Sequence, residues 1–202
     1  MTNVRVGRQR RTRISQGDIF REVECIEFVK ERRGILEVSK IVFPLVVVLT
    51  QDCDLQWDAA PASNQDKRLF AVLVAPLYNA EHVYQGQHLQ DLGLTMASIN
   101  KKATDGKTLR QNERPRYHYL DFPEDIDIVS SIVDFKHYFS VSVRYLEKAR
   151  QRNFICRLSE LYREDLSIRF AGYLARIGLP EVSPPTPPPK NNTGDVVVLA
   201  NS

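Results

Sequence analysis

The alternation of hydrophobic and polar positions predicts mainly β-strands in the first three quarters of the chain. Bulky and β-branched residues dominate positions 19–28, and the charged segment KERRG behind them predicts a turn. Two later runs, FPLVVVLT at 43–50 and RLFAVLVAPL at 68–77, are largely apolar and too short for helices. Such runs are typical of strands buried on both faces. The segments RYHYL, SSIVDFKHYFSVSV and NFICRL continue the β pattern further along the chain.

Three segments depart from the strand pattern. Residues 57–66 predict a surface loop by their Pro, Ser, Asn and Asp content, and part of 78–108 predicts helical turns. The clearest helix covers 159–177, with Ser159 suited to its N-cap and Gly178 to its end. Its apolar side chains recur along one face, at Leu158, Tyr162, Leu166, Phe170, Leu174 and Ile177.

Together these elements predict an α+β fold. We expect a strongly bent antiparallel sheet, or a partly open β-barrel, with the long C-terminal helix packed on it. A chain of 202 residues can bury one good core, so we expect a single domain over residues 14–182. The Pro-rich composition of residues 183–202 predicts a disordered tail that could dock a protein partner.

The net charge of +3 is concentrated at the start of the chain. Five arginines give the first thirteen residues a charge of +5, so the remaining residues carry −2. We therefore expect residues 1–13 to form a basic, disordered arm that attracts nucleic acid, with a merely solubilising terminus as the alternative. The arm residues that would contact nucleic acid are Arg5, Arg8, Arg10, Arg11 and Arg13.

The sequence also predicts the cellular compartment of the protein. The longest apolar run, residues 41–49, contains a proline and has nine residues, against the ~18 to 20 that span a bilayer. The basic start has no apolar stretch typical of a secretory signal, so we expect a cytoplasmic protein without a membrane partner. Three widely spaced cysteines without a CxxC pattern predict reduced thiols.

The first candidate site follows the apolar run at 43–50, in the stretch LTQDCDLQWD. Thr50, Asp52 and Asp54 alternate, so a continuing strand would place both carboxylates on one face, about 7 Å apart. Carboxylates at that spacing could hold a divalent metal, with Asp18 as a third ligand. The alternative is a pair of turn-forming aspartates that bind nearby backbone amides. Cys53 lies between two acids, which disfavours an activated thiolate.

The second candidate site lies on the RYHYL and FKHYF strands. Arg116, His118, Lys136 and His137 would place cations and titratable imidazoles on strands that we expect to pair. The neighbouring tyrosines could stack on bases, which favours a surface for nucleic acid. The alternative is an ordinary sheet face, on which Arg, His, Lys and Tyr are common cross-strand neighbours.

The segment GDIF, followed by FPLVVVLT, resembles the opening of the MazF/PemK-type toxins over about residues 15–50. This resemblance implies a Src-homology-like β-barrel and endoribonuclease activity. Thr50 falls where that family has a catalytic Ser or Thr. The family's arginine has no clean match, because Phe43 stands before the proline and the nearest candidates are Arg32 and Arg33.

The chain also resembles a set of uncharacterised bacterial proteins over a longer stretch. These proteins share a T/SQ-x-CDL motif, present here as TQDCDL, together with an RYHYL-like strand and a helix ending like YLARIGLP. The resemblance implies that the motif and the terminal helix belong to one unit, and it implies no activity.

Two functions follow from these patterns as hypotheses. The first is a bacterial nucleic-acid-interacting protein, toxin-like or defence-associated, and a candidate ribonuclease. Arg116 would then stabilise the charge of the phosphorane and His118 would move the proton alongside Thr50. A metal-dependent nuclease would instead use the aspartates as ligands. The second is a non-catalytic adaptor that docks partner proteins.

Overall fold

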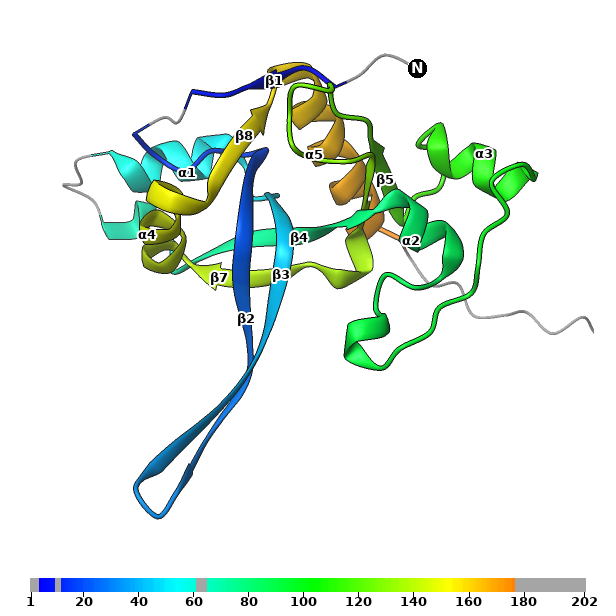
Figure 1. Cartoon of the computed structure of the whole chain (residues 1–202). Helices are drawn as coiled ribbons and strands as arrows, with labels where there is room; N and C mark the ends of the chain where they lie inside the picture. The colour runs from blue at the N-terminus through cyan, green and yellow to red at the C-terminus, as the bar shows by residue number, and fades with distance from the viewer. Residues whose placement is uncertain (1–3, 10–11, 61–64, 177–202) are drawn as a thin grey trace, which may run out of the picture.

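The computed structural model describes residues 4–9, 12–60 and 65–176 (Figure 1). Its eight strands form one antiparallel sheet in the order β1-β8-β2-β3-β4-β6-β5, and β7 also pairs with β4. The sheet curls into a half-barrel, so the predicted α+β class with a strongly bent antiparallel sheet is confirmed. The strands are β1 (Val6–Gly7), β2 (Asp18–Arg32), β3 (Ile35–Val48), β4 (Ala71–Asn79), β5 (Tyr117–Leu120), β6 (Ser131–Asp134), β7 (Phe139–Ser142) and β8 (Phe154–Leu158).

Helices fill the connections between the strands. The predicted helical turns within 78–108 are present as α2 and η2 and the start of α3. The helices are α1 (Asp52–Ala59), α2 (Ala80–Gln85), α3 (Thr104–Arg110), α4 (Val143–Asn153) and α5 (Glu160–Leu174), with 3₁₀ turns η1 (Gln65–Lys67), η2 (Gln90–Leu92) and η3 (Phe135–His137). Across the described parts of the chain, every helix is too short or too polar to cross a bilayer.

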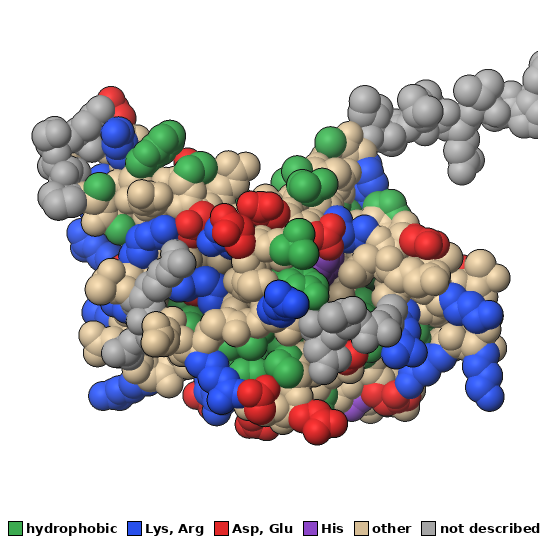
Figure 2. Space-filling view, turned by 90° about the horizontal axis from the view of Figure 1, so that it is seen from above, with side chains coloured by type: hydrophobic (Ala, Val, Ile, Leu, Met, Phe, Trp, Pro, Cys, Tyr) green, Lys and Arg blue, Asp and Glu red, His purple; other side chains and the backbone are tan. Residues whose placement is uncertain are grey.

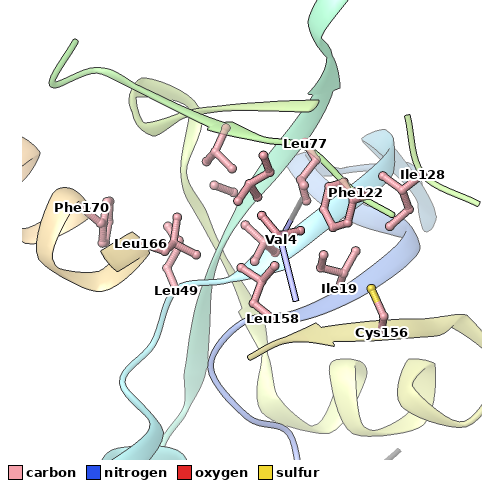
Figure 3. Packing of buried hydrophobic residues seen from close by; sticks show 14 of the residues in the cluster. Val4, Ile19, Leu49, Leu77, Phe122, Ile128, Cys156, Leu158, Leu166 and Phe170 are labelled. Carbon is pink, nitrogen blue, oxygen red and sulfur yellow. The ribbon is translucent and has the colours of Figure 1, made fainter. Parts of the chain in front are cut away.

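The strand β3 shows how the sheet buries both of its faces. Val47 joins the cluster that includes α5, whereas its neighbours Val46 and Val48 join the cluster around α4, because side chains alternate along a strand. Figure 3 shows the first cluster, in which Leu166 and Phe170 of α5 lie near residues from several strands. The parts at 46–49 and 74–77 of the apolar runs predicted at 43–50 and 68–77 are thus at the centre of the fold, whereas Phe70 is 97% exposed and β4 begins only at Ala71.

The helix α5 packs on the sheet, but it is shorter than predicted. It ends at Leu174, and Ser159 occupies the N-cap position without a side-chain hydrogen bond to the helix. Leu166 and Phe170 are buried as predicted, whereas Leu174 is half exposed. Residues 177–202, with the predicted Pro-rich tail, lie outside the described residues.

The start of the chain differs from the predicted disordered arm. Val4 is buried in the main core, and β1 pairs with β8 through Val6 and Leu158. The backbone amide of Ser159 also donates to the carbonyl of Arg5 over 2.8 Å. One buried valine and a short strand pairing therefore hold this basic segment on the sheet, an outcome that charge alone did not predict.

The strands β2 and β3 continue beyond the body as a two-stranded hairpin (Figure 1). Arg33 and Gly34 form its turn with φ values of 54° and 76°, the positive values that a two-residue hairpin turn needs. Every residue from 26 to 38 is exposed to solvent. The predicted turn at KERRG is confirmed, but the apolar residues around it lie outside the core.

Candidate functional site

The aspartates after β3 lie on a helix rather than on a strand. The helix α1 begins at Asp52, where Asp52 and Asp54 sit in the first turn and interact favourably with the helix dipole. Residues two apart on a helix do not face each other, so the expected pair of carboxylates on one strand face is wrong. Thr50 closes the strand end, because its Oγ1 accepts a hydrogen bond from the Leu73 amide over 2.7 Å.

Asp18 is fully buried at the start of β2. Its Oδ2 accepts from the Ser15 amide over 2.8 Å, and its Oδ1 lies 2.5 Å from Nε of Arg157, which is also buried. Burial raises the pKa of the Asp18 carboxyl and outweighs the opposing attraction of Arg157. The Asp18 side chain therefore already has a positively charged partner.

Asp52 is bound by the beginning of the chain. Arg13 donates two hydrogen bonds to its carboxylate, over 3.1 and 2.9 Å, and the Gln16 amide donates a third over 3.2 Å. Arg163 of α5 lies 3.5 Å from Oδ2. Burial opposes ionisation, but these contacts outweigh it and lower the pKa of Asp52. Asp52 thus joins the chain start, α1 and α5.

These carboxylates do not assemble into a set of ligands. Among the described residues, one group of three side chains has potential metal-ligand atoms within 4.8 Å of one another. This group does not contain Asp18, Asp52 or Asp54. Arginine side chains instead face Asp18 and Asp52. A metal role for the three aspartates stays a prediction, and the geometry adds no support to it.

The predicted base His118 is sealed inside the protein. Its side chain on β5 is 1% exposed, and burial lowers its pKa to about 3 with a smaller contribution from Arg169. Asp165 Oδ2 lies 3.9 Å from its Nδ1. An imidazole in this position is neutral at physiological pH and has little access to a substrate.

Thr50 and His118 also lie in different parts of the sheet. Thr50 is bound at Leu73 of β4, whereas His118 pairs with Val133 of β6, which pairs with Leu77 of β4. Thr50 follows β3 and His118 lies on β5, so β4 and β6 separate them in the sheet, and their positions are also four residues apart along β4. The structure therefore does not bring these two predicted catalytic residues together.

Two of the three described arm arginines have acidic partners as well. Arg8 pairs with Asp125, and Arg13 pairs with Asp52. Arg10 and Arg11 lie outside the described residues, while Arg5 and the predicted contact Lys136 are exposed. Acidic and basic side chains are interspersed on the face shown in Figure 2. Nucleic-acid binding by these residues stays a prediction.

A polar cluster lies where the predicted strand 130–143 is interrupted. Asp134 ends β6 and caps η3, because its Oδ1 accepts from the Lys136 amide over 3.0 Å. The turn places His137 Nδ1 3.6 Å from Asp134 Oδ2 and 3.1 Å from the Tyr78 hydroxyl. Arg116 binds the same carboxylate through Nε at 2.8 Å and Nη2 at 2.5 Å. The predicted residue Arg116 thus belongs to this cluster and not to a site with His118.

His88, from the turn after α2, joins Asp134 and His137 as a third potential metal ligand. The ligand atoms of His88, Asp134 and His137 all lie within 4.8 Å of one another. Gly86 allows this turn to pack closely against the backbone of Met96. Its φ is +74°, and a Cβ there would lie 2.1 Å from the Met96 carbonyl oxygen. Burial lowers the pKa values of His88 and His137, which favours neutral imidazoles.

An apolar cleft of about 350 Å³ borders this cluster. The segment 41–45 of β3 supplies much of its apolar wall, and Leu77, Leu89 and Leu92 extend that wall. Tyr78 and His88 line both the cleft and the cluster, and their rings lie 4.9 Å apart in an edge-on arrangement. The cleft and the cluster together are the described region that best combines a hollow with chemically versatile side chains.

The sequence did not indicate His88 as a ligand of this set, because its partners are distant in the chain. Asp134 and His137 follow 46 and 49 residues later, after η2, α3 and β5. No local spacing could have revealed this set. The signal available was that His88 and His137 are two of four histidines in the chain.

Comparison with models of protein families gives no match, and comparison with curated protein sequences gives none either.

Proposed function

We propose that this protein is a non-catalytic interaction module that assembles with a second copy of itself through the β2–β3 hairpin. The observation that carries the proposal is the exposed apolar surface of this hairpin. A two-stranded hairpin alone in water is marginally stable at best, so a long one with apolar side chains gains much from a partner. This function belongs to the same class as the adaptor considered from the sequence, but it uses the hairpin and a second copy of the chain instead of the Pro-rich tail and another protein.

One face of the hairpin concentrates the apolar side chains. Residues paired across antiparallel strands point to the same face, and so do alternate residues along one strand. The pairs Val29–Val38, Glu31–Leu36, Ile26–Lys40 and Glu24–Val42 therefore define one surface. Its apolar members, called here the apolar hairpin face, are 47% to 68% exposed: Ile26, Val29, Leu36, Val38 and Val42.

The charge of the hairpin favours a protein over nucleic acid as the partner. Residues 21–42 contain five Lys or Arg and five Glu, so this segment has no net charge. A surface that binds a polyanion normally carries excess positive charge, because counterion release supplies most of the affinity. The five glutamates would instead repel phosphates.

The same charges suit a second copy of this chain. When two hairpins pack face to face in antiparallel orientation, the tip of one lies over the base of the other. The surface that contains the apolar hairpin face also carries Glu31 near its tip and, near its base, Lys40, which is paired with Glu24. A two-fold axis near the Val29–Val38 pair therefore brings opposite charges together across the interface, with valines at its centre.

The expected result for the whole chain is a dimer whose fraction increases with concentration in sedimentation velocity. Val38→Glu introduces like charges close to the two-fold axis and should give a monomer. Ile35→Glu is the matched control, because Ile35 is 71% exposed on the opposite face and receives the same substitution. This control should remain a dimer.

A wild-type chain that stays monomeric at the highest concentration would refute the proposal, as would a Val38→Glu variant that still dimerises. Circular dichroism of both variants checks that the exposed substitutions leave the fold intact. A salt titration of RNA binding tests the rival nucleic-acid function. A monomer whose RNA affinity falls steeply with salt would favour that rival.

A further inference from the structure

We infer that His88, Asp134 and His137 bind a divalent transition metal, with zinc as the expected ion. Two imidazoles and one carboxylate form a ligand set that zinc sites use, with the fourth position open to water or another donor. The three potential ligand atoms lie within 4.8 Å of one another although they come from three different places in the chain. This site is separate from the aspartates considered from the sequence.

The unsatisfied nitrogens of His88 are the second observation. Neither ring nitrogen is accessible to solvent, and neither has a hydrogen-bond partner in the described part of the chain. The backbone of His82 makes at most a weak, poorly aligned hydrogen bond to the ring, which leaves both nitrogens without a well-placed partner. Buried polar groups without a partner are uncommon in native proteins, and a bound ion can satisfy those that occur.

The geometry requires a modest contraction. Bonds of about 2.1 Å in a tetrahedral site place ligand atoms roughly 3.4 Å apart, so binding must draw the three side chains together by on the order of 1 Å. His88 and His137 are partly exposed and come from a turn and a 3₁₀ turn. Rotation of the two rings is sufficient for such a movement.

Arg116 is the competitor that the site must accommodate. It holds the Asp134 carboxylate through two nitrogens, and its positive charge acts against a cation nearby. A carboxylate offers about four lone-pair sites, so Oδ2 can accept from Arg116 and still bind an ion on the side of His137. Ligating carboxylates are commonly hydrogen-bonded in this way by outer partners.

The test is a titration of the full chain, treated with a chelator and dialysed, with Co²⁺ followed by visible absorption. We expect the intense bands of a four-coordinate site and their loss when Zn²⁺ is added. His88→Ala and His137→Ala should each weaken Co²⁺ binding by more than about 100-fold, beyond the 10- to 100-fold effect of outer-shell partners.

His82→Ala is the matched control. His82 is exposed and lines the same cleft, but it does not belong to the three-residue set, so this variant should bind Co²⁺ like the wild type. An absence of Co²⁺ bands in the wild type would overturn the inference. Equal losses in the His82 and His88 variants would also overturn it, by revealing adventitious binding. Far-ultraviolet circular dichroism confirms that each variant is folded.

Discussion

Truncation of Leu166 to alanine should strongly destabilise the protein, while the same change at Leu161 should not. Both leucines lie on α5, so the substitution has the same chemistry and the same effect on helix propensity. Leu166 is 0% exposed within the main core, whereas Leu161 is 72% exposed. The comparison isolates the contribution of burial.

The expected loss follows from the groups removed. Leu→Ala removes three carbons, and at ~0.8 kcal/mol for each buried group the transfer free energy is about 2.4 kcal/mol. A residual cavity on the order of 50 Å³ adds about 1.2 kcal/mol if the surroundings do not relax. We therefore expect Leu166→Ala to lower the free energy of unfolding by roughly 2.4 to 3.6 kcal/mol. The change at Leu161 should stay within about 0.5 kcal/mol.

Urea unfolding followed by circular dichroism measures both values. A lower midpoint with an unchanged slope for Leu166→Ala would report lost stability, because the slope reflects the surface exposed on unfolding. Equal midpoints for the two variants would refute the reasoning. They would show that α5 is not packed on the sheet through Leu166.

Two further predictions concern the backbone and pH. Gly86→Ala should destabilise the fold more than Gly93→Ala, although φ is +74° and +72°, because a Cβ at Gly86 would lie 2.1 Å from the Met96 carbonyl oxygen while one at Gly93 has nothing within 4 Å. Urea midpoints compare the two, and equal losses would contradict the steric argument. His118→Phe should flatten the acid loss of stability. Burial lowers the pKa of His118 from 6.5 to about 3, so below pH 6.5 the unfolded chain binds a proton that the folded chain excludes. Unfolding measurements at pH 4 and 7 test this. If the wild type and the variant lose the same free energy of unfolding between pH 7 and pH 4, the prediction is wrong.

The fold class was predictable because the buried strands have a strong local signal. The run around Val46–Val48 is β-branched and apolar, and it lies at the centre of the sheet with both faces covered. The terminal helix was predictable for a similar reason, since Leu166 and Phe170 repeat at helical spacing. The end of that helix was less predictable, because Leu174 fits the apolar stripe but finds no buried surface.

The candidate site was much less predictable because it depends on contacts far apart in the sequence. Asp52 and Asp54 alternate as strand residues do, yet they begin a helix in which Leu55 is the buried side chain. Arg116 and His118 are also two residues apart, but one binds Asp134 and the other faces α5. Alternation in the sequence can place side chains on one face of a strand, but it does not specify which residues that face contacts.

The hairpin shows most clearly that residues can form a strand without being buried. The segment ILEVSKIV alternates only imperfectly between apolar and polar residues, yet it forms a strand within β3. Alternation usually indicates that one face is covered, yet Leu36 is 68% exposed and Val38 is 49% exposed. A strand edge and an apolar face left open are features that natural proteins normally protect. Because no described part of the chain covers the apolar hairpin face, this exposed face favours a second protein surface over the hairpin.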